Sequence, residues 1–241
     1  MEVIPIAEES LGVRSMAMFV RTRDLSILLD PGISLSPNRY GLPPHPRELE
    51  RVRALRSVLE KYAEEANYVF ISHYHRDHFT VPYQSIYMGT TNDSYRKIYS
   101  GKIVLMKSPD DENWSQRRRY YGLRRAIEGI VKELVFADGK EFNIGSTRLV
   151  ISQSLPHGEE NAKTGRVVAI TIIEDDEVLT FMPDVEGPVS QSAIDYVMSM
   201  KPKILVVGGP PLYLSRRGFG EEYVSNALSN LTAILRAGFL N

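Results

Sequence analysis

The sequence predicts one α/β domain in which β-sheets are sandwiched by helices. Three observations predict it. The first thirty residues are rich in strand-forming apolar residues, one amphipathic helical segment follows, and strand-like and helix-like segments then alternate toward the C-terminus. Neither a low-complexity linker nor a short-period repeat divides the 241 residues, so we expect a single domain over residues 1–241.

The expected strands are short apolar runs bounded by turn residues. They cover residues 15–22, 25–29, 68–72, 103–106, 147–151, 167–173, 178–182 and 204–207. The expected helices have apolar residues every three or four positions, as Val52, Leu55 and Leu59 do. They cover residues 47–66, 115–135, 190–200 and 221–237, and the tyrosine-rich residues 82–101 are expected to be irregular.

The composition is that of an ordinary globular protein, with 43% hydrophobic and 24% charged residues. The net charge of −1 gives no sign of a nucleic-acid partner or of an anionic membrane surface. The absence of cysteine excludes disulfides, thiolate zinc sites and a cysteine nucleophile. No signal peptide and no apolar run near the ~18 residues of a membrane span are visible, so we expect a cytoplasmic protein without a membrane partner. The sequence does not determine the oligomeric state.

The most informative segment is an H-x-H-x-D-H motif that runs from His73 to His78. It places three of the five histidines and one aspartate in six residues, directly after the apolar run 68–71. Imidazole and carboxylate are ligands that suit zinc and its first-row neighbours. The sequence therefore predicts a metal site at the end of a strand, with one or two ions, zinc first and iron or manganese as alternatives.

The spacing within the motif constrains which side chains can meet one ion. In an extended segment His73, His75 and Asp77 share a face, because side chains alternate with a period of two. His78 breaks this alternation, so the motif could offer two ligands to one ion and two to a neighbouring ion. Tyr74 and Arg76 point away, and each is expected either in the wall of the site or behind the ligands as support.

Three further polar residues stand where a predicted strand ends. His157 follows the strand at 147–151, and Asp184 follows the strand at 178–182. Each alone would more often be a structural residue than a ligand, and the histidine motif raises the expectation for both. Asp30 lies in an Asp-Pro-Gly turn, where it serves either the turn itself or the orientation of a ligand histidine.

Asp30, the motif His73–His78, His157 and Asp184, in this order, resemble the metallo-β-lactamase superfamily of metal-dependent hydrolases. Further segments look like one uncharacterised, mainly archaeal family of that superfamily, and the match runs nearly the whole length. These segments are Asp30-Pro31-Gly32, residues 39–46, Ser115-Gln116-Arg117-Arg118-Arg119, Pro156-His157-Gly158, residues 184–188 and residues 208–214.

The resemblance implies a metallo-β-lactamase-like αββα sandwich of two mixed sheets, with helices on both outer faces and the metals at one edge. It implies that His73, His75 and His157 hold a first metal. It also implies that Asp77 and His78 hold a second metal, with Asp184 bridging, so that Asp77 and Asp184 are the catalytic carboxylates. Two ions would bind a hydroxide that acts as the nucleophile.

One departure from the family concerns the last ligand. The superfamily supplies a further histidine near the C-terminus, within an Asp-His-His segment in this family, and here no histidine follows His157. We therefore expect either a chain truncated relative to its relatives or an incomplete second site. His45 is the only spare histidine, and we expect it to be a loop or rim residue rather than the missing ligand.

The function implied is a metal-dependent hydrolase, with a phosphoester substrate slightly favoured over a lactone or another acyl substrate. Alternatives are a non-catalytic metal-binding protein and a nuclease, although the neutral net charge counts against a nucleic-acid partner. The expected partner is a small anionic molecule. Arg117 and Arg118 belong to an arginine-rich helical segment that is either an anion-binding rim or a solvated helix face.

Overall fold

The computed structural model describes residues 1–210, 212 and 220–240. Pro211, Tyr213 and Leu214 of the glycine–proline segment 208–214, and Asn241, lie outside the described residues. The chain divides into two compact units, which are Met1–Asp110 with Trp114–Phe136 and Asp111–Asn113 with Ala137–Asn241. Each unit is built on one main β-sheet, and the expectation of a single domain stays a prediction.

Unit 1 contains a six-stranded mixed sheet with the order β1-β2-β3-β4-β5-β6. Its strands are β1 (Glu2–Glu8), β2 (Met16–Arg21), β3 (Ser26–Leu29), β4 (Tyr68–Ile71), β5 (Ile103–Met106) and β6 (Glu133–Phe136). β1, β2 and β3 pair antiparallel, whereas β3 to β6 pair parallel. The carboxyl ends of β3 and β4 therefore meet at one edge, where Asp30 and Ser72 follow them.

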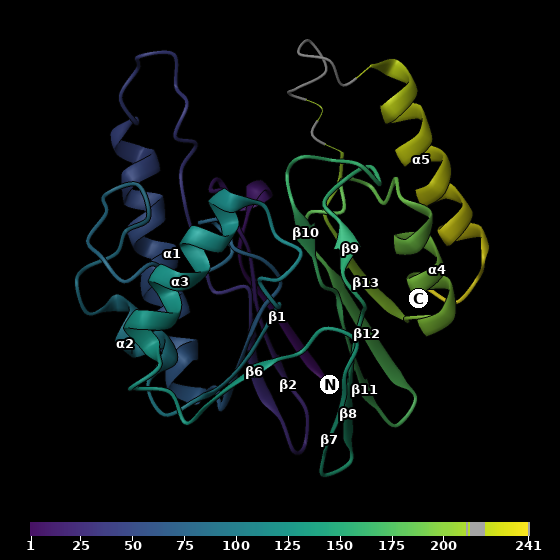
Figure 1. Cartoon of the computed structure of the whole chain (residues 1–241), viewed down its shortest axis with the longest axis horizontal. Coiled ribbons are helices and arrows are strands. Elements are labelled where there is room, and N and C mark those ends of the chain that lie inside the picture. Colours follow the sequence, from purple (N-terminus) through teal and green to yellow (C-terminus); the bar gives the residue numbers. More distant parts are fainter. Residues whose placement is uncertain (211, 213–219, 241) are drawn as a thin grey trace. The chain divides into compact units, whose positions relative to one another are not determined.

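The helices of unit 1 are the short 3-10 turn η1 (Glu9–Leu11), α1 (Pro46–Glu65), α2 (Ser94–Tyr99) and α3 (Trp114–Ile127). In Figure 1 α1, α2 and α3 gather on one side of this sheet. The apolar stripe of α1, which includes Val52 and Leu59, packs into a core with Phe19, Val69 and other inward-facing strand residues. His45 precedes this helix as its N-cap, and its Nδ1 accepts a hydrogen bond from the Arg47 amide at 3.2 Å.

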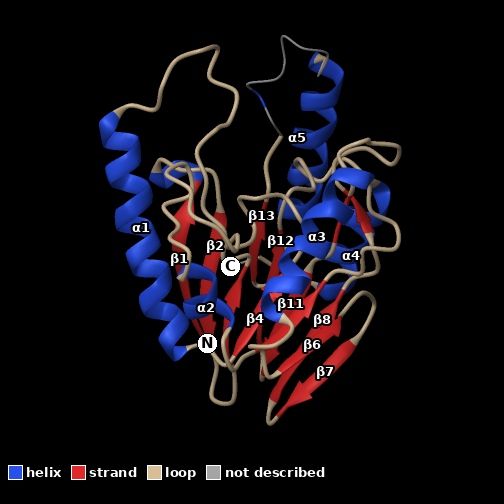
Figure 2. Cartoon of the chain, turned by 60° about the vertical axis from the view of Figure 1, so that its left-hand side comes forward, coloured by secondary structure: helices blue, strands red, loops and turns tan. Residues whose placement is uncertain are grey.

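Unit 2 contains a five-stranded mixed sheet with the order β13-β12-β11-β8-β7 (Figure 2). Its strands are β7 (Glu141–Ile144), β8 (Thr147–Ile151), β11 (Ile170–Glu174), β12 (Glu177–Met182) and β13 (Ile204–Val207), and β9 (Leu155–Pro156) pairs with β10 (Arg166–Val167) in a separate ribbon. The helices are α4 (Gln191–Met200) and α5 (Glu221–Arg236), which contact each other. None of the helices formed by the described residues of either unit could cross a bilayer.

The predicted fold class, two mixed sheets with helices, is confirmed, but several elements differ from the expected ones. The helix expected over residues 115–135 ends at Ile127, and the apolar residues after it form β6, which pairs with β5. Strands β1 and β7 and helix α2 were not expected as separate elements. β1, β6 and β7 all lie at sheet edges, where pairing with a neighbour rather than a strong local pattern makes the strand.

The turn after β3 brings the backbone of the histidine motif against Gly32. A Cβ atom added at Gly32 would lie 2.3 Å from the Phe79 nitrogen and 2.5 Å from the Asp77 carbonyl carbon. Real Cβ atoms do not approach backbone this closely, so only glycine fits. The Asp-Pro-Gly turn and the end of the H-x-H-x-D-H motif are therefore packed backbone to backbone.

We expect Gly32→Ala to destabilise the protein by about 3 kcal/mol, because overpacking against backbone cannot be relieved by a side-chain rotation. The matched control is Gly122→Ala in α3, where an added Cβ meets nothing within 4 Å and the free energy of unfolding should rise by about 0.5–1 kcal/mol. Urea unfolding of both variants measures the difference. Equal stability of Gly32→Ala and the wild type would show that the motif backbone does not need this contact.

Candidate metal centre

Asp30 is buried in unit 1 and accepts hydrogen bonds from several polar groups near the histidine motif. It follows β3 with a positive φ of 43°. Its Oδ1 accepts the Ser72 amide at 2.7 Å, and its Oδ2 accepts the Ser72 hydroxyl at 2.5 Å and His78 Nδ1 at 2.7 Å. Burial raises the pKa of the Asp30 carboxyl, and the hydrogen bonds from His78 and Ser72 oppose that rise. Because both oxygens accept hydrogen bonds from the chain, Asp30 is placed to orient Ser72 and His78.

This network determines which nitrogen of each histidine carries the proton. The Ser72 hydroxyl has one proton, which it donates to Asp30, so its 2.9 Å contact with His73 Nδ1 must be one in which His73 donates. His78 likewise donates from Nδ1 to Asp30. In the neutral form of each ring, the lone pair of His73 and of His78 is then on Nε2. Neutral imidazole with one bare nitrogen is the form that coordinates a metal.

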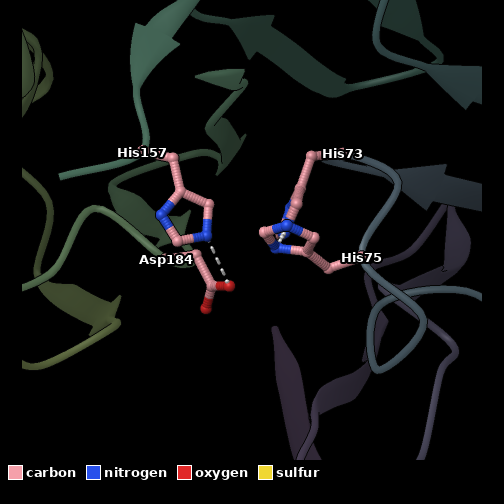
Figure 3. Close-up of side chains that lie close together, drawn as sticks. All are labelled: His73, His75, His157 and Asp184. Carbon is pink, nitrogen blue, oxygen red and sulfur yellow. Dashed lines mark hydrogen bonds and ion pairs between the residues drawn. The ribbon is translucent and has the colours of Figure 1, made fainter. Parts of the chain in front are cut away.

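His75 brings a second imidazole nitrogen to the coordinating side of His73. Its Nδ1 lies 3.0 Å from His73 Nε2, and the two rings are nearly perpendicular, at 83° (Figure 3). Two nitrogens bound to one tetrahedral zinc at about 2.0–2.1 Å would be roughly 3.3 Å apart. The observed separation is close to that value, so the two nitrogens suit ligation of the same ion.

Asp77 has a cationic partner that the motif alone does not suggest. The carboxylate is buried, and its Oδ2 accepts from Arg14 Nη2 at 2.9 Å. Arg14 lies just before β2, in a segment whose local sequence resembles no binding motif. The negative charge of Asp77, which was expected to bind a second metal, is therefore already balanced by the guanidinium of Arg14.

In unit 2 His157 lies between two carboxylates. It follows β9, and its amide donates to the Gly165 carbonyl at 3.1 Å. Its Nε2 is 3.1 Å from Asp184 Oδ2 (Figure 3), and its Nδ1 is 3.3 Å from Glu186 Oε1. The Tyr223 hydroxyl of α5 donates to Glu186 in turn. Glu186 is thus placed to orient the imidazole ring through Nδ1, whereas Asp184 lies beside Nε2.

Left-handed backbone and nearby glycines make this arrangement fit. Asp184 and Glu186 have φ values of 51° and 56° in the turn after β12. A Cβ at Gly158 would lie 2.6 Å from Glu186 Oε2, and one at Gly208 would lie 2.6 Å from the Asp184 nitrogen. The Pro-His-Gly and Gly-Gly segments therefore leave room for the two acidic residues.

The structure groups most of the expected site residues within one unit or the other. Unit 1 brings Asp30, His73, His75 and His78 together, and unit 2 pairs His157 with Asp184. Which ion these residues bind, and with what geometry, stays a prediction.

The remaining expected residues have other surroundings. His45 caps α1, Arg117 is exposed and Arg118 lies over the Trp114 ring, 5.6 Å from its centre. The expectation that His45 is a loop or rim residue rather than the missing ligand stays a prediction.

Four functional candidates escaped the sequence analysis. Ser72 and Glu186 stand next to expected site residues in the chain, so their proximity was a usable signal. Arg14 and Tyr223 come from distant segments, and no local pattern marks them.

The two carboxylates change the protonation of His157. Burial alone would lower its pKa, but the hydrogen bonds and charges of Asp184 and Glu186 outweigh burial and raise the pKa to about 9. A metal ion that took Nε2 would have to replace a proton, so we infer that metal binding strengthens with rising pH.

In metal-free protein we expect the His157 ring to titrate near pH 9 by NMR. Between its ordinary pKa of 6.5 and about 9 the folded chain would hold a proton that the unfolded chain has lost. The His157 contribution to stability is therefore complete below pH 6.5 and disappears as the pH rises through about 9. In the His157→Gln variant, the free energy of unfolding should fall less between pH 6.5 and about 9 than in the wild type. A pKa of the His157 ring at or below 6.5 would contradict the stabilisation of its charged form by Asp184 and Glu186.

No family model matches the chain. The solved structures that match include a metallo-β-lactamase fold protein, YhfI from Bacillus subtilis (15% identity, 79% of this chain and 62% of that chain, TM-score 0.45). A UPF0282 protein of Pyrobaculum aerophilum is 56% identical over 214 residues, which cover 89% of this chain and 71% of the relative. Another from Thermococcus gammatolerans is 39% identical over 237 residues, covering 98% and 78%. These relatives confirm the expected archaeal family, and the chain belongs to the UPF0282 proteins.

Proposed function

We propose that this protein is a metal-dependent hydrolase in which His73 and His75 of unit 1 and His157 of unit 2 bind one ion, with Asp184 beside it. The Asp30–Ser72–His73 network is the observation that carries the proposal, because it presents His73 Nε2 in the form that coordinates a metal. His73 and His75 provide two imidazole donors, and His157 would provide a third. Catalytic zinc sites take three protein ligands and keep one position open, which the two sets together would supply.

The residues around these ligands support the same role. Asp30 and Ser72 orient His73, and the Glu186 carboxylate lies 3.3 Å from His157 Nδ1, on the side of the ring where metal-binding histidines commonly have an acidic or carbonyl partner. A bound ion of the zinc type lowers the pKa of a coordinated water to about 7 and stabilises charge on a phosphoryl or carbonyl oxygen. Zinc is the proposed ion, because the donors are mainly imidazoles, with iron or manganese as alternatives.

A second ion would use Asp77 and His78, with Asp184 bridging. Arg14 already supplies a positive charge to Asp77 at 2.9 Å. We therefore propose that the second position binds an ion more weakly than the first.

A phosphoester is the proposed substrate class. His75 and Asp77 line a cavity together with arginines, whose planar forks match the geometry of phosphate oxygens. A lactone or another acyl ester would not need this positive charge, so the relative rates on the two substrate classes test the choice.

We expect purified protein to hold about one tightly bound equivalent of transition metal, and His75→Ala to lose most of it because a direct ligand is removed. His45→Asn is the matched control, since asparagine keeps the N-cap of α1. Elemental analysis after dialysis measures both. Wild-type protein without metal after supplemented expression, or full metal content in His75→Ala, would contradict the proposed site.

We expect the metal-loaded protein to hydrolyse bis(p-nitrophenyl) phosphate faster than p-nitrophenyl acetate, with turnover abolished by a chelator and restored by added metal. Asp184→Asn should lower kcat by at least about a hundredfold if Asp184 is a catalytic carboxylate, whereas His45→Asn should not. Metal-loaded protein that turns over neither ester would identify a metal-binding protein without catalysis. Faster acetate hydrolysis would overturn the phosphoester assignment alone.

A further inference from the structure

Unit 1 contains a cavity of about 470 Å³ beside the histidine motif. This volume lies within the range of about 300–1,000 Å³ that is typical of small-molecule sites. Its charged lining residues are Arg14, Arg76, Asp77 and Arg119, and the imidazole of His75 lies beside them. The cavity therefore adjoins the proposed ligand His75 without being built from the metal ligands alone.

The charges of this cavity favour an anion. Among the described residues that line it, three are arginines and Asp77 is the only carboxylate. Asp77 pairs with Arg14 at 2.9 Å, and one carboxylate cannot balance three guanidinium groups, so the lining has an excess of positive charge. Guanidinium groups that converge on one space bind phosphate oxygens through paired hydrogen bonds.

Arg119 is held in place by the motif itself. Its Nη1 donates to the Tyr74 carbonyl at 3.2 Å, and Gln116, one turn earlier on α3, accepts the Tyr74 amide at 2.8 Å. Burial and then the nearby Arg76 charge lower the pKa of Arg119. Two guanidinium groups are thus kept close together, and an anion between them would relieve their repulsion.

A second cavity, of about 300 Å³, extends the same positive surface. It shares Arg76, Tyr83 and Arg119 with the first and adds Arg118, and no carboxylate is among its described lining residues. Arg117 lines neither cavity. Of the two arginines expected to bind substrate, the structure therefore favours Arg118 and replaces Arg117 by Arg119.

We propose that Arg76 and Arg119 form a binding site for the phosphate group of the substrate, with Tyr83 as an aromatic wall. Assigning the anion to a substrate rests on the proposed hydrolase function. The binding site itself does not, since it needs neither a metal nor turnover.

The test is calorimetric titration of inorganic phosphate into metal-free full-length protein. We expect wild-type protein to bind phosphate, and Arg119→Gln and Arg76→Gln each to weaken the dissociation constant by about tenfold or more, because a charged hydrogen bond is lost. Arg125→Gln is the matched control, since Arg125 is an exposed arginine of α3 that lines neither cavity. It should leave phosphate binding within about twofold of wild type.

Arg76→Gln keeps the test decisive if Arg119→Gln disturbs folding through the lost bond to Tyr74, because the Arg76 side chain is exposed. The proposal would be overturned if wild-type protein bound no phosphate. It would also be overturned if both variants bound phosphate as tightly as wild-type protein does. Acetate binding as tightly as phosphate would overturn the phosphate assignment. Metal content is measured on the same samples, so failure of the metal site and failure of the anion site are told apart.

Discussion

The candidate metal centre of unit 1 depends on one buried carboxylate, that of Asp30. It joins the ends of two parallel strands, because it follows β3 and binds the amide and hydroxyl of Ser72 after β4. Through Ser72 and His78 it also determines the protonation of two imidazoles. A buried carboxylate is stable only when such donors surround it, so fold and site impose the same requirement on these residues. Gly32, two residues later, lets the motif backbone approach closely enough to complete the arrangement.

The two units prepare their histidines in opposite ways. In unit 1 His73 and His78 direct Nδ1 at Ser72 and Asp30, which places Nε2 on the other side of each ring. In unit 2 the acidic pair Asp184 and Glu186 raises the pKa of His157 to about 9, so the metal-free ring is held as a cation. An ion that took Nε2 of His157 would have to displace this proton. The affinity for the ion would then rise with pH, because His157 of unit 2 must lose its proton first.

The arginine-lined cavity shows how helical phase can separate neighbouring residues of the same type. Gln116 and Arg119 are three positions apart on α3, share one face, and both bond to the backbone of Tyr74. Arg117 lies off that face and is exposed. An arginine-rich helix that looks like a solvated surface thus contributes one arginine directly to the surroundings of the histidine motif.

The sequence by itself determined the parts of this protein whose partners are close along the chain. The motif His73–His78, and the positions of Asp30, His157 and Asp184 after predicted strands, could be read because a strand and the residues that end it are one continuous segment. The tertiary structure alone decided the contacts between distant segments, such as Arg14 with Asp77 and Tyr223 with Glu186. It also decided that the residues after Ile127 join the sheet as β6. These features depend on strand pairing and on the direction of individual side chains, and neither has a local signature in the order of residues.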